Sequence, residues 1–317
     1  MIVNHGVITL GETLIDFIPT DETNSTYHKS PGGAPANVAV GVARLGGDSS
    51  FLGMVGDDVL GRFLQETLQF YHVNTEQLFF SKDHRTGIVF VTNREGGERS
   101  FDFYINPSAD RFLEENHINR EHLLRHRILH FGSISLISEP AEGATRAAVK
   151  LAKENGLLIS YDPNLRLMLW DSKEEAKDRI ISMLGEVDIL KISEEELAFI
   201  TDKKSVKEGL EMLEPYEIPV IFVTLGAEGC YVKTMEGNRH VPAMKVKAID
   251  TTGAGDAFVS GVLYSVDQYA SDLHALTLEE ASRIAKFASV SGGLAASTKG
   301  AMTALPTKAE VESYLDR

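Results

Sequence analysis

Cysteine is almost absent from this chain of 317 residues, since Cys230 is the only one. A single cysteine excludes an internal disulfide and a metal site built from cysteines, and a small buried thiol is its simplest interpretation. Nowhere do about 18 apolar residues follow one another, so no transmembrane helix is expected. Residues 1–12 show no basic segment followed by a long apolar run, so we expect no signal peptide and a cytoplasmic protein.

Basic residues are also in short supply. The chain has 46 acidic and 31 basic residues, and its formal net charge is −15. A surface of that sign repels nucleic acid and anionic lipid, so neither is expected as a partner. An anionic substrate would then need a local positive feature, such as a helix N-terminus or a metal ion. The hydrophobic fraction of 43% is typical of a globular protein with a large core.

Short apolar segments alternate with amphipathic helices after residue 125. Strands are predicted at 128–131, 157–161, 187–192 and 218–225, and helices at 141–155 and 173–184. Near-continuous apolar strands separated by helices predict an α/β fold, a doubly wound, mostly parallel sheet with helices on both faces. Ligands of such sheets bind at the carboxyl ends of the strands.

The first third of the chain has a different pattern. Residues 86–92 and 98–105 alternate apolar and polar side chains around a Gly-rich turn at 94–97, which predicts a β-hairpin. Phe101, Phe103 and Ile105 fall on one face of it. The residues alone leave two interpretations: a hairpin packed on the main core, or a small separate sheet that covers a site. Because no repeat or long linker is present, we expect one domain over residues 1–317.

The strongest motif is Asp-Thr-Thr-Gly-Ala-Gly-Asp-Ala-Phe at residues 250–258, between a strand-like segment (244–249) and an apolar helix. Thr252 is expected to be the N-cap. The free N–H groups of Gly253, Ala254 and Gly255, together with the helix dipole, predict an anion site. Asp256 lies beside that site, where an acid is unfavourable unless it accepts a proton from an attacking hydroxyl. The alternative is a Gly-rich helix entry with an Asp that stabilises the dipole.

A second motif runs from residue 31 to residue 47. Pro35 suits the first turn of a helix, and Gly46 suits its C-terminal stop. Asn37 is the polar residue in that first turn. It either binds a ligand, since its amide donates and accepts hydrogen bonds, or makes a local capping contact.

Further candidates follow other predicted strands. Asp16 either accepts hydrogen bonds from two sugar hydroxyls or stabilises a turn. Arg166, in the run Asp-Pro-Asn-Leu-Arg, either binds a phosphate, carboxylate or diol, or lies on the surface. Glu196 is a candidate for holding Mg²⁺ through water, whereas the acids at 194–195 suit a solvated helix start. The glycine turn at 224–229 could border a nucleotide.

Together these segments resemble the ribokinase family of carbohydrate kinases, to which fructokinases belong, over nearly the whole chain and in the same order. The resemblance implies transfer of the γ-phosphoryl group of ATP to a sugar hydroxyl, with Asp256 as base and Gly253, Ala254 and Gly255 as the anion hole. It also implies a ribokinase-like fold with a β-sheet lid, here formed by about residues 13–31 and 86–106. The lid interpretation of the hairpin is therefore favoured.

The resemblance also assigns ligands residue by residue. The sugar is expected to contact Asp16, Gly32, Gly33, Asn37 and, on the lid, Phe101 and Phe103. The nucleotide is expected near Thr224, Gly226, Gly229 and Ser289. A monovalent cation, K⁺, would be bound by Asp250, Thr252 and carbonyls near Ala295, Thr298, Gly300 and Ala304. Ribokinases have Asn-x-x-Glu where this chain has Ser193 to Glu196, preceded by Lys191. The role of that Asn near Mg²⁺ and phosphate is therefore open at Ser193, and Lys191 is a candidate to share it.

The Asp-Pro-Asn-Leu-Arg run followed by Trp170 is more similar to fructokinases and 2-keto-3-deoxygluconate kinases than to ribokinases. Arg166 is therefore expected to contact the sugar, with fructose as substrate and fructose 6-phosphate as product. A 2-keto-3-deoxygluconate kinase, or another carbohydrate or nucleoside kinase of the family, is the alternative. The intact Asp256 argues against a non-catalytic sugar sensor, and Gly11-Glu12-Thr13 argues against a dinucleotide oxidoreductase. An exposed apolar face of the lid could pair in a homodimer.

Overall fold

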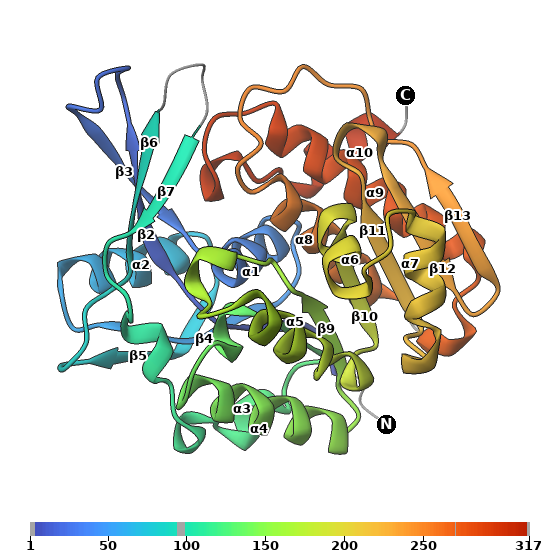
Figure 1. Cartoon of the computed structure of the whole chain (residues 1–317), viewed down its shortest axis with the longest axis horizontal. Coiled ribbons are helices and arrows are strands. Elements are labelled where there is room, and N and C mark those ends of the chain that lie inside the picture. The colour runs from blue at the N-terminus through green and yellow to red at the C-terminus, as the bar shows by residue number, and fades with distance from the viewer. Residues whose placement is uncertain (1–3, 94–98, 270, 316–317) are drawn as a thin grey trace.

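The computed structural model describes residues 4–93, 99–269 and 271–315, and in that part of the chain the strands form two sheets (Figure 1). The larger, nine-stranded sheet has the order β13 (Gly237–Val241), β12 (Cys230–Thr234), β11 (Val220–Thr224), β10 (Ile189–Ser193), β9 (Leu158–Asp162), β8 (Ile128–Gly132), β1 (Val7–Leu10), β4 (Ser49–Gly56) and β5 (Asn74–Ser81). All neighbours from β11 to β5 are parallel, and β12 and β13 are antiparallel additions at one edge. The predicted mostly parallel sheet is confirmed.

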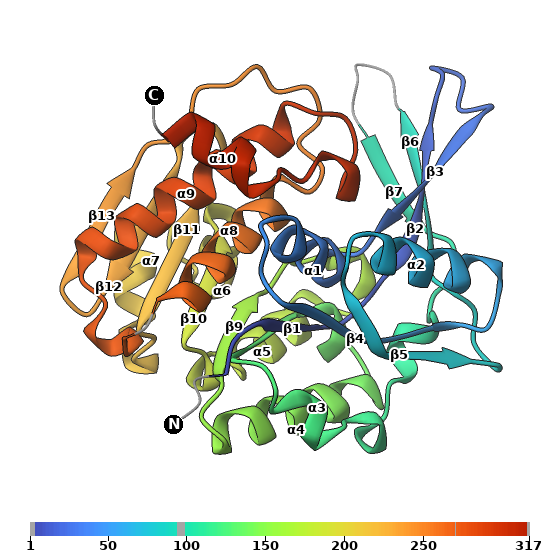
Figure 2. The same ribbon diagram turned by 180° about the vertical axis from the view of Figure 1, so that it is seen from behind.

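Helices cover both faces of this sheet (Figures 1 and 2). One face carries α1 (Ala34–Arg44), α2 (Val59–Phe70), α8 (Ala254–Gln268), α9 (Leu278–Ala296) and α10 (Lys308–Leu315). The other carries α3 (Arg120–Leu123), α4 (Ala141–Glu154), α5 (Lys173–Ile181), α6 (Glu194–Thr201) and α7 (Val206–Met212). None of the described helices combines the length and the apolar character that crossing a membrane requires.

Alternation along the strands divides the core between these two faces. On β10, Leu190 and Ile192 pack in the core beneath α4 to α7, whereas Ile189 packs in the core beneath α8 and α9. Successive side chains of a strand point to opposite faces. Lys191 therefore points to the face covered by α8, and this direction brings a cation to the start of that helix.

The smaller, four-stranded sheet stands beside the main body (Figure 1). Its order is β3 (Tyr27–Gly32), β2 (Leu14–Pro19), β6 (Ile88–Asn93) and β7 (Arg99–Phe103). The predicted hairpin is therefore β6 and β7, which pair antiparallel. Its predicted turn at 94–97 lies outside the described residues. The separate sheet contradicts the interpretation of the hairpin as part of the main core.

The predicted strand at 244–249 is wrong, because this segment has no regular secondary structure. Its apolar side chains at 244, 246 and 248 line a cavity instead of facing a neighbouring strand. Alternation of side chains indicates which side of a segment faces apolar surroundings, but not whether a second strand is there to bond the backbone. The N–H groups of Ile249 and Asp250 donate to the carbonyl of Ala296, at the end of α9.

Candidate active site

The start of α8 is built from a glycine and not from a polar cap. Gly253 is the N-cap residue, with φ of 75°, and no side chain caps the helix there. The expectation that Thr252 is the N-cap is therefore wrong. Its N–H and hydroxyl instead donate to Oδ1 of Asp250, at 3.1 and 2.7 Å, while Oδ2 of Asp250 accepts from the N–H of Gly300. No side chain caps the first N–H groups of α8, as an anion site requires. The N–H of Ala254, which the sequence predicted to be free, instead donates to the carbonyl of Thr251 at 3.2 Å.

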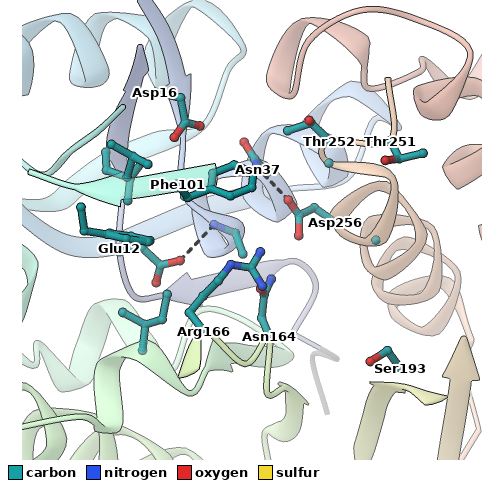
Figure 3. Close-up of a pocket in the computed structure, with 18 of the residues that line it drawn as sticks. Glu12, Asp16, Asn37, Phe101, Asn164, Arg166, Ser193, Thr251, Thr252 and Asp256 are labelled. Atoms are coloured by element: carbon teal, nitrogen blue, oxygen red, sulfur yellow. Dashed lines mark hydrogen bonds between the residues drawn. The ribbon is translucent and has the colours of Figure 1, made fainter. Parts of the chain in front are cut away.

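Asp256 lies in the first turn of α8 and is 8% exposed. Its Oδ2 accepts a hydrogen bond of 2.7 Å from Nδ2 of Asn37, which comes from the first turn of α1 (Figure 3). Burial raises the pKa of the Asp256 carboxyl above its ordinary value, against the opposing effects of Asn37, Lys191 and Arg166. A raised pKa makes the carboxylate a better proton acceptor. For Asn37, the structure contradicts the alternative of a purely local capping contact.

A cavity of about 420 Å³ opens in front of Asp256. Predicted residues that line it are Asp16, Gly33, Asn37, Phe101, Phe103, Arg166, Lys191, Ser193, Glu196, Thr252, Gly253, Gly255 and Asp256. Parts of the chain as distant as β2 and α8 thus meet at one place, beyond the carboxyl ends of the parallel strands. The sequence predicted most of this lining.

Asp16 projects into this cavity from β2 of the small sheet, so it is not a turn residue (Figure 3). Burial raises the pKa of Asp16 to about 6, although the Arg166 guanidinium opposes this. Gly32, at the end of β3, pairs with Leu14 on β2 and does not itself line the cavity. A Cβ on Gly32 would overlap with Oδ2 of Asp16. The missing side chain at 32 therefore gives the Asp16 carboxylate its room.

The small sheet supplies one wall of the cavity. The residues of this wall are Leu14 and Asp16 on β2, Val89 on β6, and Phe101 and Phe103 on β7. Val89 pairs with Asp16 on one side and with Phe103 on the other, so these side chains lie on the same face of the sheet. Phe101 is nonetheless 48% exposed. An aromatic side chain that is half open to solvent over a polar cavity is suited to pack on a bound ligand. That this sheet closes as a lid remains a prediction.

Arg166 enters the cavity from the loop after β9, beside Asn164 (Figure 3). Asn164 has a positive φ of 45° and lines the same cavity, although the sequence did not mark it as a candidate. The Arg166 guanidinium lowers the pKa of both Asp16 and Asp256, so it is close enough to bias two carboxylates. A planar donor fork between carboxylates is well placed to bind hydroxyl groups.

Lys191 forms a buried ion pair with Asp162, its Nζ lying 3.0 and 3.2 Å from the two carboxylate oxygens. Burial alone lowers the pKa of the Lys191 ammonium, but Asp162, Glu196 and Asp256 outweigh this effect and raise it. A Cβ built on Gly255 would lie 3.6 Å from the same Nζ. A protonated amine therefore adjoins the first turn of α8 and adds a full charge to the helix dipole.

Ser193 and Glu196 form a capping box at the start of α6. The Ser193 side chain accepts from the N–H of Glu196, and Oε2 of Glu196 accepts from the N–H of Ser193. Oε1 of Glu196 also accepts a bond of 2.7 Å from the N–H of Leu165. Both side chains line the cavity, so the Glu196 carboxylate is fixed at its edge, and its role toward Mg²⁺ remains a prediction. Glu194 and Glu195 are exposed, as expected for a solvated helix start.

A second cavity, of about 580 Å³, lies on the other side of the α8 N-terminus. Thr224, Gly226, Gly229 and Ser289 line it, which brings together the residues expected near a nucleotide. Its wall includes Met244, Val246 and Ala248, so one side suits a flat ring system, and Lys245 lines it as well. Thr251 and Gly255 line both cavities. The start of α8 thus stands where two bound molecules would meet.

The residues expected to bind a monovalent cation come together only in part. Asp250, Thr252 and Gly300 are joined by hydrogen bonds, and Ala295 and Ala304 belong to the end of α9 and to a short 3₁₀ turn, Met302–Ala304. Thr298 lies in the loop between them. The loop after α9 therefore approaches the Asp250 carboxylate, and cation binding remains a prediction.

Glu12 is a second polar cavity residue that sequence reasoning missed. It is 4% exposed, and its Oε1 accepts a 3.0 Å bond from the N–H of Ala34 at the start of α1 (Figure 3). Burial raises its pKa from 4.5 to about 8, although its hydrogen bonds and Arg166 oppose this. In the sequence, Glu12 follows the first apolar strand in the same way as an ordinary turn acid, so nothing marked it as buried.

We expect the buried Glu12 to make the protein less stable as the pH rises. The folded state keeps the Glu12 proton up to about pH 8, whereas the unfolded chain releases it near 4.5. Stability therefore falls through that window, by roughly 3–4 kcal/mol relative to Glu12→Gln between about pH 5 and pH 8. Urea unfolding of both proteins at the two pH values measures this difference. Glu12→Ala, which also loses the acceptor for Ala34, should be destabilised at both. A pH-independent difference between wild type and Glu12→Gln would contradict the expectation.

Comparison with known proteins gives consistent matches over the whole chain. A model of the "pfkB family carbohydrate kinase" matches residues 4–308. The Arabidopsis thaliana protein "Probable fructokinase-6, chloroplastic" is 45% identical over 317 residues, covering 98% of this chain and 82% of that protein. "Fructokinase-1" of Oryza sativa subsp. japonica is 46% identical, with 98% and 97% covered.

Among solved structures, a fructokinase double mutant from Vibrio cholerae O395, in a form with fructose, ADP and potassium ion bound, matches with a TM-score of 0.90 at 42% identity. The match covers 99% of this chain and 100% of that chain. The ribokinase-like fold expected from the resemblance is confirmed. Two cavities that meet at a glycine-rich helix start, and matches that run from one end of the chain to the other, show that this chain belongs to the pfkB family of carbohydrate kinases.

Proposed function

We propose that this chain phosphorylates fructose with ATP and releases fructose 6-phosphate and ADP. One observation carries the proposal: the polar cavity in front of Asp256 and the more apolar cavity beside Gly226 share Thr251 and Gly255 at the start of α8. A sugar in the first and a nucleotide in the second would meet at an anion site. The names of the relatives favour fructose over 2-keto-3-deoxygluconate.

The transfer needs little more than positioning and charge stabilisation. A primary hydroxyl of the sugar attacks the γ-phosphorus in line, and the bond from phosphorus to the bridging oxygen of ADP breaks. Asp256 accepts the hydroxyl proton, while the N–H groups of Gly253 and Gly255, at the uncapped start of α8, and the Lys191 ammonium stabilise the charge on the transferred group. Asp16 and Arg166 hold the other hydroxyls of the sugar, and Phe101 covers it.

Two ions fit the residues around this site. Mg²⁺ would supply charge neutralisation during the transfer, and Glu196, fixed at the cavity edge by its backbone bonds, is the residue that would hold its water. K⁺ would be held by Asp250 and Thr252 with carbonyls near Ala295, Thr298, Gly300 and Ala304. The bonds that already join Asp250 to Thr252 and Gly300 place suitable oxygens near the start of α8.

An ADP-release assay with a panel of acceptors tests the function. We expect kcat/KM for fructose to exceed that for 2-keto-3-deoxygluconate, ribose and a nucleoside by at least about tenfold, since unpaired polar groups in the cavity penalise a poorly fitting acceptor. With no acceptor, ADP release should be at least about a hundredfold slower, because closure over the sugar excludes water. Fastest turnover with 2-keto-3-deoxygluconate would overturn the substrate, and no turnover with any acceptor would favour a sensor.

Two further expectations remain predictions. The first is the cytoplasmic location. The second is a homodimer formed through the lid. Tyr104, 67% exposed, and Phe90 pack edge to face on the small sheet. Such aromatic side chains at a sheet surface suit an interface.

A further inference from the structure

The hydrogen bond between Asn37 and Asp256 joins two helices, and the two residues are 219 positions apart in the sequence. Asn37 is 5% exposed and lies on α1, which packs directly on α8. The packing is close, because a Cβ on Gly41 would overlap with Oγ of Ser260. The Ser260 hydroxyl lies within hydrogen-bonding distance of the backbone carbonyls of Asp256, at 2.7 Å, and Val38, at 3.3 Å. The first turns of both helices are therefore fixed relative to each other.

The orientation of the Asn37 amide follows from chemistry. Only its Nδ2 can donate to a carboxylate, because turning the amide over would place Oδ1 against an oxygen of Asp256. Nδ2 lies 2.7 Å from Oδ2 of Asp256, as a charge-assisted hydrogen bond requires. Oδ1 of Asn37 is buried and has no hydrogen-bond partner within the described part of the chain. A buried acceptor without a donor is costly unless a ligand supplies one.

We propose that Asn37 is a positioning residue for the base: it occupies Oδ2 of Asp256 and thereby directs Oδ1 to the hydroxyl that is to be phosphorylated. The proposal rests on the proposed sugar kinase activity and goes beyond the sugar contact that the family resemblance implies for Asn37. The same amide would accept, through its free Oδ1, a hydrogen bond from a neighbouring sugar hydroxyl. Sugar binding and orientation of the base are then coupled in one side chain.

The hydrogen bond also favours the ionised form of Asp256, since a donor stabilises a carboxylate. Other charged groups around it act as well: Lys191 on β10 and Arg166 after β9 favour ionisation, whereas Asp16 on β2 and Asp162 on β9 oppose it. Glu12 and Glu196 line the same cavity. With these groups unchanged, removal of the Asn37 donor raises the pKa of the base.

The test compares Asn37→Ala with wild type in steady-state kinetics across pH. At saturating sugar, kcat should fall about tenfold or more at acid pH, the cost of a hydrogen bond to a charged group. It should recover only in part as the pH rises, because the carboxylate is then ionised but no longer directed to the hydroxyl. The acid limb of the profile should move to higher pH. If Asn37 only binds sugar, KM for the sugar rises while kcat and the acid limb stay as in wild type, and that result overturns the proposal.

Ser260→Ala is the matched control for helix packing. It removes a hydroxyl from the same contact between α1 and α8 but leaves the carboxylate of Asp256 untouched. We expect it to lower thermal stability without moving the acid limb. Should Ser260→Ala and Asn37→Ala shift the profile equally, the effect would come from packing and the proposal fails.

A measurement without substrate separates this inference from the proposed function. In sugar-free protein with ¹³C-labelled Asp, the carboxyl signal of Asp256, assigned by its loss in Asp256→Asn, should titrate at higher pH in Asn37→Ala than in wild type. An unchanged titration overturns the positioning role whatever the activity. Absence of turnover in wild type with every acceptor, with the titration shifted as expected, would instead overturn the kinase proposal alone.

Discussion

Asp256→Asn is expected to lower turnover by roughly 10²–10⁴-fold, the usual cost of removing a general base, which corresponds to about 3–5 kcal/mol of barrier. The substitution keeps the shape of the side chain, and its amide oxygen still accepts the bond from Asn37. Burial already disfavours the charge on Asp256, so the free energy of unfolding should be no lower than that of wild type. Turnover of fructose by the purified variant, at saturating ATP, measures the effect.

Binding of ATP distinguishes loss of the base from loss of the site. A carboxylate beside an anion site repels the γ-phosphate, so the neutral variant should bind ATP at least as tightly as wild type in calorimetry. Gly255→Val is the contrasting variant. The side chain that it adds points toward Nζ of Lys191 and occupies the wall shared by both cavities, so ATP binding should weaken. If Asp256→Asn turns over within about threefold of wild type, Asp256 is not the base.

Motifs in the sequence predicted the residues that act through the backbone. The run from 250 to 258 predicted free N–H groups at a helix start, and no side chain caps them in the structure. The N-cap is however Gly253 and not Thr252, and the N–H of Ala254 donates to the carbonyl of Thr251. Strand ends were predictable in the same way, because apolar runs mark strands and parallel strands end at one edge of a sheet. Arg166 and Lys191 reach the cavity for that reason.

What the sequence could not predict depends on contacts between distant segments. Glu12 is neutral up to about pH 8 only because other parts of the fold bury it. The bond from Asn37 to Asp256 depends on how closely α1 and α8 pack. The segment 244–249 has the apolar pattern of a strand because it faces a cavity, and a pattern cannot tell a cavity from a core. Burial and partner identity are properties of the fold, so local patterns do not contain them.

Lys191→Met is expected to show that one side chain has two separable roles. The substitution leaves the Asp162 carboxylate buried without its cation, and breaking such a pair typically costs about 3–5 kcal/mol of unfolding free energy. It also removes the positive charge next to Gly255, where the transferred phosphoryl group would lie. Removal of one group that stabilises a transition-state oxyanion typically lowers kcat by roughly 10²–10³-fold, and we expect a loss of the same size here.

The double variant Lys191→Met/Asp162→Asn separates the two roles. Replacing the carboxylate by a neutral amide removes the uncompensated charge, so urea unfolding should show that most of the lost stability returns. The missing ammonium is not restored, so kcat should stay low. Asp162→Asn alone keeps the ammonium beside Glu196 and Asp256, and should keep most of the turnover. If the double variant instead recovers both stability and turnover, Lys191 is needed only for folding, and the role of the family Asn near the phosphate falls to Ser193.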